Sequence, residues 1–527
     1  MGLELRTIQD ASIWASSFLG KNVTVSNISY LVNYGRISKY SKDGTVYISL
    51  SELKSYYESY MTSRQVDWRE KLGEDTNWQL SFENLKESDT TKHVHRIHPY
   101  KGKFIPQLVE YFLDDHIDEF KREIYFHQGD TILDPFCGSG TTLVQANELG
   151  MNAIGVDVSA FNALISNCKI AHYNIEALRK ELDNITLKLQ EFHTQSNIDI
   201  FETELISELK SFNDKYFPVP EYKRSVRLGR IDSSVYGAEK AEIFASTYKT
   251  LIEKYHIELL NVNPKTFLDK WFVGSVKREL IFVLELLEQI QDENICNIAK
   301  VILSRTMRSC RATTHADLAT LVEPIATTYY CSKHGKICKP LFSIVKGWKT
   351  YVSDTISRIE KFSKLKTQTS QICLVGDSQT IDIEDALNSC HSTILETAKN
   401  GKVQGIFTSP PYVGLIDYHE QHAYAYDLFD FERNDSLEIG SMSSGQGKLA
   451  QEKYVLAISN VLNNCKAFLD DNYDVFIVAN DKYNLYPIIA ENAGMRIVNR
   501  YKRPVLNRTE KDKKAYSEIV FHLKEKE

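Results

Sequence analysis

The sequence predicts an α/β fold in which one open, mostly parallel sheet is interrupted by a helical insertion and preceded by a small amino-terminal unit. From Gly129 onward, short apolar runs alternate with amphipathic helical stretches, and the same alternation returns near the carboxyl end of the chain. Between these portions, residues 171–365 have mostly helical periodicity. The two outer portions are therefore expected to build a single sheet.

Composition limits the class of protein. The chain has 527 residues, of which 43% are hydrophobic and 25% charged, as expected of a globular protein with two or three domains. Its net charge of −7 argues against a protein that coats nucleic acid non-specifically, so a nucleic-acid contact must be regional. The nine cysteines form no dense framework, which predicts free thiols. No long apolar stretch or signal-peptide pattern is present, so we expect a cytoplasmic protein.

Residues 1–68 are expected to form the amino-terminal unit. Two short helices, the first ending at Leu19-Gly20 and the second over residues 25–33, precede a hairpin that turns at Asp43-Gly44. Ser51 then caps a third helix. This order resembles the winged helix-turn-helix units of the MerR and excisionase type, which place a helix in a DNA groove. A small helical cap on the main domain is the alternative.

Residues 69–170 and 366–527 are expected to form the first and second parts of the sheet domain. The apolar runs predict strands at residues 130–136, 153–158, 372–375, 403–408, 473–479, 496–501 and 518–523. In such sheets the loops at the carboxyl ends of the strands carry function. The insertion, residues 171–365, enters at one of these loops and is a candidate recognition domain. A dimerisation or stabilising subdomain is the alternative.

A glycine-rich turn follows the first predicted strand, with the sequence Asp134-Pro135-Phe136-Cys137-Gly138-Ser139-Gly140-Thr141-Thr142. Its glycines let the backbone turn sharply and approach a ligand closely. The turn lacks the Gly-Lys-Ser/Thr ending of a triphosphate-binding loop. The second strand ends at Asp157, whose carboxylate can accept both hydroxyls of a ribose. The combination indicates a nucleoside ligand with no phosphate to cradle.

This turn resembles the cofactor motif of the amino-directed DNA methyltransferases, which surrounds the methionine part of S-adenosylmethionine. The resemblance implies a Rossmann-like methyltransferase sheet. It extends to residues 98–106, similar to the family's segment that closes over the methionine carboxylate, and to residues 375–378. By this resemblance Asp157 holds the ribose, Asp377 lies near the adenine, and the other cofactor contacts are Tyr100, Lys103, Phe104, Asp134, Pro135, Phe136, Gly138, Gly140 and Thr141. Taken singly, Asp157 as a helix cap and Asp377 as a turn residue remain alternatives.

The catalytic candidates lie in a second motif, which follows an apolar strand and reads Ser409-Pro410-Pro411-Tyr412. Two adjacent prolines forbid helix and ladder continuation, so the backbone is rigid there. An exocyclic amino nitrogen is a poor nucleophile, because its lone pair is delocalised into the ring. The Ser409 side chain and the Pro410 carbonyl can accept its two hydrogens, and Tyr412 offers a face on which an extruded base stacks.

The first residue of this motif bears on the base that is modified. Within the family, Ser-Pro-Pro-Tyr is associated mainly with cytosine N4, whereas an Asp or Asn in place of the serine is usual for adenine N6. The chain has no Pro-Cys pair, which disfavours carbon-5 chemistry. The resemblance therefore implies a cytosine-N4 methyltransferase acting on double-stranded DNA, the modification component of a restriction-modification system, with a cognate endonuclease as its implied partner. Adenine-N6 methylation, RNA guanine-N2 methylation, and a DNA-binding regulator on an inactive scaffold are the alternatives.

Other polar clusters have less specific interpretations. Residues 414–420 with His422, Tyr424 and Tyr426 either line the base pocket or pack a helix on the sheet. Two basic groups are candidate phosphate contacts or solvated loops: Arg500, Lys502, Arg503, Arg508, Lys511, Lys513 and Lys514, and also Lys223, Arg224, Arg227 and Arg230.

Five cysteines and histidines of the insertion invite a metal interpretation, because thiolate and imidazole are the ligands that zinc prefers. They are Cys310, His315, Cys331, His334 and Cys338. Structural zinc sites usually show two tightly spaced pairs, which this spacing lacks. We therefore expect no metal, only packed thiols and a surface histidine.

Overall fold

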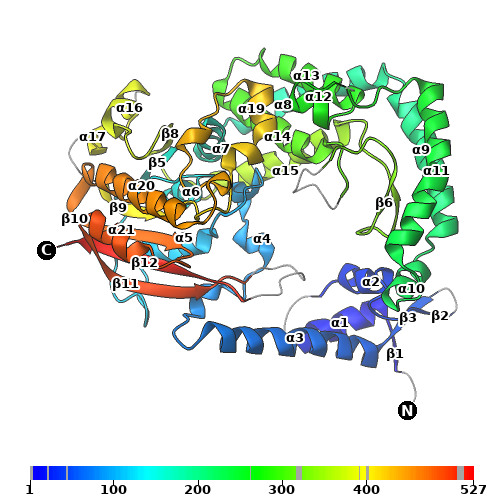
Figure 1. Ribbon diagram of the computed structural model, residues 1–527, viewed down its shortest axis with the longest axis horizontal. Coiled ribbons are helices and arrows are strands. Elements are labelled where there is room, and N and C mark those ends of the chain that lie inside the picture. Colours follow the sequence, from blue (N-terminus) through cyan, green and yellow to red (C-terminus); the bar gives the residue numbers. More distant parts are fainter. Residues whose placement is uncertain are drawn as a thin grey trace.

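In the computed structural model, the described residues are 4–19, 23–42, 45–261, 263–315, 323–390, 392–398, 403–506 and 515–526. Figure 1 shows a sheet domain on one side, an arch of insertion helices, and the amino-terminal unit below that arch. Among the described residues, no helix is both long enough and apolar enough to span a membrane.

The central sheet confirms the predicted α/β fold. Within the described residues its strand order is β11-β12-β10-β9-β4-β5-β8. All neighbouring pairs from β10 to β8 are parallel, and β12 is antiparallel to both β10 and β11. The strands are β4 (Thr131–Asp134), β5 (Asn152–Asp157), β8 (Gln371–Val375), β9 (Val403–Thr408), β10 (Leu469–Ala479), β11 (Met495–Pro504) and β12 (Ser517–Glu525). Every predicted strand is present, and the chain returns to the same sheet after the insertion.

Helices cover both faces of this sheet, which explains why its strands are continuous apolar runs. Successive residues of a strand enter opposite cores: Phe407 and Phe476 pack on one side, and Ile406 and Val475 on the other. The first side is covered by α5 (Pro106–Leu113), α6 (Thr141–Glu148) and α7 (Ala160–Ile170). The second side is covered by α16 (Ile383–Ser389), α20 (Lys448–Lys466) and α21 (Tyr486–Asn492).

Short elements connect these layers. They are η1 (Gln79–Ser81), α4 (Glu87–Thr90), η2 (His93–Arg96), α17 (Leu395–Ala398), α18 (Tyr418–Gln421), α19 (Ala423–Phe429), η3 (Asp435–Leu437) and η4 (Met442–Ser444).

The insertion is helical, as predicted, with one small hairpin. Its helices are α8 (Ile175–Thr194), α9 (Ile198–Tyr216), α10 (Glu221–Arg227), α11 (Ser233–Tyr255), α12 (Phe267–Trp271), α13 (Gly274–Leu287), α14 (Glu293–Cys310) and α15 (Val345–Ser363). The hairpin pairs β6 (Tyr329–Cys331) with β7 (Lys336–Cys338). The long helices α9 and α11 lie side by side at the end of the arch far from the sheet (Figure 1).

The amino-terminal unit contains the predicted two helices, hairpin and third helix, preceded by a short strand that was not predicted. It consists of β1 (Leu5–Thr7), α1 (Ile8–Leu19), α2 (Val25–Asn33), β2 (Tyr40–Lys42), β3 (Thr45–Ser49) and α3 (Leu50–Leu72), with the antiparallel order β1-β3-β2. Gly20 and the turn residues Asp43 and Gly44 lie outside the described residues. Ser49, rather than Ser51, caps α3 by accepting from the amide of Glu52. The winged-helix interpretation stays a proposal.

Contacts at two ends of this unit join it to the other parts of the chain. The Lys223 ammonium of α10 lies 3.7 Å from the centroid of the Tyr34 ring, beside the end of α2. At its other end, α3 reaches the sheet domain, where Lys502 of β11 donates to the Leu72 carbonyl at 2.6 Å. The unit therefore bridges the far end of the insertion and the sheet.

Candidate functional site

The carboxyl ends of four parallel strands meet at one edge of the sheet, because neighbouring strands are in register. Asp134 of β4 pairs with Gly155 of β5, and Asp157 of β5 pairs with Val375 of β8. Next to these ends lies an open cavity of about 820 Å³.

Most of the predicted cofactor residues line this cavity. They come from four separate parts of the chain: Tyr100, Lys103 and Phe104; Pro135, Phe136, Gly138 and Thr141; Asp157; and Asp377. Asp134 and Gly140 are not among the lining residues. Their contribution is to the shape of the turn.

Asp134 is buried beneath the glycine-rich turn and supports it through hydrogen bonds. Its carboxylate accepts from the Thr408 hydroxyl at 2.6 Å and from the Phe136 amide at 3.2 Å. Burial raises the pKa of Asp134 to about 6. Because Thr408 ends β9 and immediately precedes the Ser-Pro-Pro-Tyr motif, Asp134 ties the glycine-rich turn to the catalytic candidates.

The two glycines of the turn have different reasons to be glycine. Both have a left-handed backbone, with φ of +52° at Gly138 and +72° at Gly140. A Cβ on Gly138 would lie 2.9 Å from the Tyr100 hydroxyl inside the cavity. A Cβ on Gly140 would instead lie 2.9 Å from the Ser166 side chain of α7. Gly138 thus keeps the cavity open, and Gly140 lets α7 approach the turn.

Asp157 lies at the cavity wall with its carboxylate held by the chain. It accepts from the Gly138 amide at 2.7 Å, the Ser159 amide at 2.9 Å and the Asn162 side chain at 3.1 Å. Burial raises the pKa of Asp157 to about 6 despite these donors. The carboxylate therefore has a fixed orientation and is charged at neutral pH.

The segment before α5 supplies a cation to the same cavity. Lys103 donates to the His95 carbonyl, and burial lowers its pKa to about 8. It is therefore largely protonated at neutral pH. The Tyr100 ring stacks on Tyr418 with 5.7 Å between ring centroids. One wall of the cavity is thus aromatic, and a positive charge lies at its edge.

The sequence interpretation missed a lysine beneath the turn. Lys169 of α7 is 1% exposed and donates to the Ser139 carbonyl. Burial lowers the pKa of Lys169 well below its usual value. It also missed Asn162 and the stretch Leu437–Ile439, which line the cavity. Nothing in the local pattern distinguished these residues from packing residues.

The Ser-Pro-Pro-Tyr motif borders two cavities. Ser409 and Pro411 line the cavity already described, and Pro410 is buried. The Ser409 hydroxyl donates to the Val478 carbonyl of β10 at 2.9 Å. Since its single proton is engaged there, its lone pairs remain available as acceptors.

Tyr412 faces a second cavity of about 650 Å³ together with Tyr454, Tyr483 and Tyr486. Its hydroxyl donates to Glu518 at 2.8 Å, and Glu518 in turn pairs with Arg503 at 3.1 Å. Tyr412 is therefore placed at the second cavity and is not among the residues that line the first. The anchored hydroxyl could not be foreseen from the motif.

Most of the aromatic and imidazole side chains named after the motif are buried packing residues. His422, Tyr424 and Tyr426 are each 4% exposed or less, and Tyr426 bonds Ser159 at 2.5 Å. Of this run, Tyr418 is the aromatic residue that lines the first cavity. The packing alternative therefore describes Tyr424 and Tyr426.

The basic groups are partly structural. Lys502 pairs with Asp75 at 2.8 Å, and Arg503 donates to the buried Leu80 carbonyl at 3.1 Å. Lys223 lies against Tyr34. Arg508, Lys511, Lys513 and Lys514 lie outside the described residues. Lys502, Arg503 and Lys223 therefore serve first to join parts of the chain.

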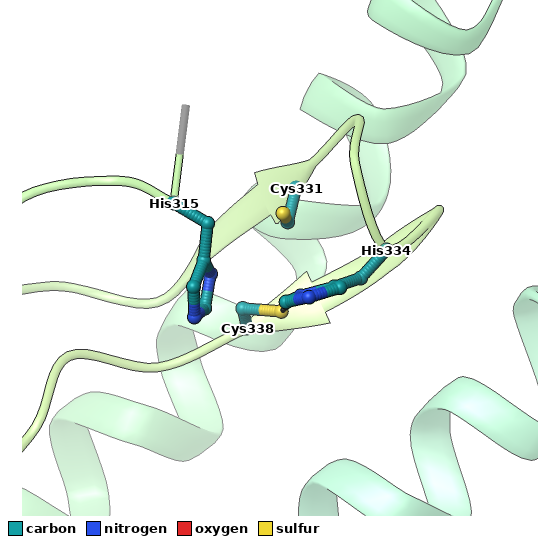
Figure 2. A group of neighbouring side chains, drawn as sticks. All are labelled: His315, Cys331, His334 and Cys338. Atoms are coloured by element: carbon teal, nitrogen blue, oxygen red, sulfur yellow. Dashed lines mark hydrogen bonds between the residues drawn. The ribbon is translucent and has the colours of Figure 1, made fainter. Parts of the chain in front are cut away.

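Four of the five cysteines and histidines of the insertion lie closer together in space than their spacing along the sequence suggested. One ligand atom from each of His315, Cys331, His334 and Cys338 lies within 4.8 Å of the others (Figure 2). Cys310 is not in this group and is buried at the end of α14. The thiols of Cys331 and Cys338 are packed, as expected, but His334 is half-buried rather than at the surface, and β6 and β7 bring these residues together with His315.

Comparisons with known proteins agree with this geometry. Residues 7–167 match a family model of DNA methylases, and residues 111–266 match the model of D12 class N6 adenine-specific DNA methyltransferases. Over 99% of this chain and 98% of the relative, the sequence is 47% identical to Type II methyltransferase M.MjaII of Methanocaldococcus jannaschii. Type II methyltransferase M.BsoBI of Geobacillus stearothermophilus is 27% identical over 40% of this chain and 44% of its own.

Among solved structures, an rRNA methyltransferase, aviRa from Streptomyces viridochromogenes, aligns with 85% of this chain and 96% of its own. The alignment has 9% sequence identity and a TM-score of 0.29.

Proposed function

Since the chain belongs to the Type II DNA methyltransferases, we propose that it transfers methyl groups from S-adenosylmethionine to N4 of cytosine in duplex DNA. In a restriction-modification system, it would protect the sites that a cognate endonuclease cuts. Methyltransferases of this type use S-adenosylmethionine, which supplies an electrophilic methyl carbon when bound. The observation that carries the proposal is Ser409, an acceptor at the wall of the cofactor cavity.

The residues of the first cavity suit this cofactor. Asp157 offers fixed carboxylate oxygens to ribose hydroxyls, and Lys103 offers a positive charge to an amino-acid carboxylate. Gly138 leaves space where any side chain would meet Tyr100. Asp377, at the end of β8, is proposed to lie near the adenine. These residues bind and orient the cofactor.

The catalytic motif is proposed to act by accepting hydrogen bonds. Ser409 and the Pro410 carbonyl would hold the two amino hydrogens of the target base, so that the nitrogen lone pair is directed away from the ring plane. The two prolines keep these acceptors fixed. Tyr412 is proposed to stack on the extruded base from the second cavity. Positioning and hydrogen bonding then account for most of the rate enhancement.

Adenine N6 is the second candidate, favoured by the match of residues 111–266 to the D12 adenine-specific model. The two bases make different demands on the site. Both present an exocyclic amino group with two hydrogens, but the adenine ring system is larger. The serine at position 409 supports cytosine, because the family resemblance associates a carboxylate or amide there with adenine.

A methyl-transfer assay separates these candidates. The full chain is incubated with duplex DNA and methyl-labelled S-adenosylmethionine, and the DNA is digested to nucleosides. Label in N4-methylcytosine is the expected result. Label in N6-methyladenine would refute the base assignment, and unlabelled DNA beside labelled RNA would refute the DNA reaction.

Ser409→Ala tests the role of the motif in the same assay. Removing one acceptor should lower the transfer rate by about 10²- to 10³-fold with cofactor affinity retained. Ser389→Ala, on the exposed surface of α16, is the matched control and should leave the rate unchanged. An unimpaired Ser409→Ala enzyme would exclude the serine from the reaction.

Recognition of the target sequence is proposed to be shared. The insertion enters the chain before β8, rather than after the cofactor segments, and the amino-terminal unit lies against its α10. We assign target contacts to both parts, with residues 171–365 as the recognition domain and residues 1–68 as its partner.

A further inference from the structure

We propose that His315, Cys331, His334 and Cys338 form a structural zinc site that fixes the β6–β7 hairpin to the preceding loop of the insertion. The donor set is two thiols and two imidazoles, which zinc prefers in four-coordinate sites. One ligand atom of each lies within 4.8 Å of the others. In a tetrahedral site, zinc–ligand bonds of about 2.0–2.3 Å place ligand atoms about 3.3–3.8 Å apart, so only small side-chain movements are needed.

The hairpin presents its two cysteines on one face. Cys331 pairs with Lys336, two residues before Cys338, so both sulfurs project to the same side of the hairpin. His334 lies in the turn between the strands, and Figure 2 shows His315 directed toward the group from the segment opposite. Three ligands therefore come from eight successive residues, and the fourth is brought in by the fold.

The opposite face of the hairpin packs on the insertion helices. Tyr330 and Ile337 are paired on that face, and Asn213 of α9 binds both backbone groups of Ile337, at 2.9 and 3.0 Å. Tyr330 covers Gly237 of α11 so closely that a Cβ there would lie 2.3 Å from its ring. The face with the thiols is thus turned away from the main core.

This outer face has little apolar packing of its own. Its cluster consists of Tyr329, Cys331 and Cys338, with Ile325 against it. Two three-residue strands are too short to be stable without additional support. A bound zinc ion would provide that support, as it does in other small metal-stabilised units.

Neighbouring contacts already orient the imidazoles. The Tyr329 hydroxyl lies 2.8 Å from His315 Nδ1, which directs the other ring nitrogen of His315 to the metal. His334 Nδ1 lies 3.4 Å from Cys338 Sγ, a contact that zinc would replace with two bonds. Both sulfurs are free cysteines in the structure. Such outer contacts accompany most histidine ligands of zinc.

A second group of possible ligands, His93, His95 and Glu148, does not meet the same test. Lys92 donates to Glu148 at 2.6 Å, so the carboxylate already has a cation partner. The group contains no thiol. We therefore assign the metal to the hairpin alone.

Metal analysis of the full chain tests the proposal. The protein, freed of any histidine tag and dialysed against metal-free buffer, should retain about one zinc ion per chain by plasma mass spectrometry. Titration with a mercurial thiol reagent should release that zinc in parallel with modification of two thiols. Neither measurement depends on a variant that folds. Zinc far below one per chain, or a Cys331–Cys338 disulfide in a non-reducing peptide map, would overturn the assignment.

Variants then locate the metal. Cys331→Ser and Cys338→Ser should each lose the zinc, whereas Cys296→Ser, which alters a half-buried thiol on α14 of the same insertion, should keep it. Cobalt-loaded protein should show the visible absorption and thiolate charge-transfer band of a tetrahedral site, and both should be absent from Cys331→Ser. Full zinc content in the two hairpin variants would place the metal elsewhere and refute the proposal.

Discussion

Gly138→Ala should weaken cofactor binding as well as the fold. Two effects act at this position. The left-handed backbone, with φ of +52°, costs an L residue about 1–2 kcal/mol. The new Cβ would also lie 2.9, 3.1 and 3.2 Å from three atoms of the Tyr100 side chain, well inside the ordinary contact distance of about 3.5–4.0 Å. Tyr100 must therefore withdraw from the turn.

The second effect is specific to the cavity. Tyr100 stacks on Tyr418, so its displacement disturbs a wall that both rings form. We expect the dissociation constant for S-adenosylmethionine to rise at least tenfold, which corresponds to about 1.4 kcal/mol. Gly150→Ala is the matched control. Gly150 has φ of +75°, follows the other end of α6, and would bring its Cβ only to 3.5 Å from Gln128.

Isothermal titration with S-adenosylmethionine and denaturant unfolding should be run on both variants. Both variants should show a similar decrease in the free energy of unfolding, because each places an alanine in a left-handed backbone conformation. Only Gly138→Ala should lose cofactor affinity. Equal cofactor affinities in the two variants would refute the argument that Gly138 is needed to keep the cavity open beside Tyr100.

Three further predictions follow from the site. Cofactor affinity should fall as pH drops through about 6, because protonation of Asp157 removes acceptor oxygens. Calorimetric titrations at several pH values should show this fall in affinity, and Asp157→Asn should abolish the pH dependence. In the cofactor-free chain the sign is opposite: the folded pKa is raised, so this carboxyl's contribution to stability is present at low pH and lost as pH rises through about 6. Tyr412→Phe should lower the free energy of unfolding by about 1.5–3 kcal/mol in thermal unfolding, because Glu518 loses a hydrogen-bond donor. The variant should still transfer methyl groups, because the ring remains. Loss of transfer with normal cofactor binding would give the hydroxyl a role in the reaction. Lys169→Met should weaken cofactor binding, because Lys169 holds the Ser139 carbonyl of the turn, and unchanged affinity would show that the turn is rigid without it.

The fold was largely predictable from local patterns. Parallel strands buried on both faces read as short apolar runs, and the runs at residues 130–136 and 403–408 became β4 and β9. The mostly helical periodicity of residues 171–365 became the helices of the insertion, among them α13 and α14. The start of α14 is set by Asp292, whose side chain caps the helix by accepting from the amide of Ile295. Apolar runs and helical periodicity therefore identify the elements well, and side-chain caps set the limits of the helices.

The site was predictable where a motif places residues at the end of a strand. Asp157 and Ser409 both line the cavity, because parallel strands in register bring their carboxyl ends together. Asp134 shares that position but turns into the core, where Thr408 and the Phe136 amide use its carboxylate. A motif match alone cannot separate a residue that contacts the ligand from one that supports the loop. The distinction depends on partners far away in sequence.

The Cys/His group of the hairpin shows what the spacing of possible ligands in the sequence leaves out. The rule that zinc ligands occur as two tight pairs treats each pair as a local structure. Here Cys331, His334 and Cys338 are local, but His315 depends on how its own segment is held. That segment is fixed by the Ala312 amide, which donates to the Trp271 carbonyl at 2.7 Å, and by the Ala312 carbonyl, which accepts from the Ile325 amide at 2.7 Å. These bonds connect α12, the end of α14 and the approach to β6, so the fourth ligand is placed by tertiary structure. A sequence with three local ligands and an unpaired histidine upstream should therefore not be excluded as a metal site on spacing alone.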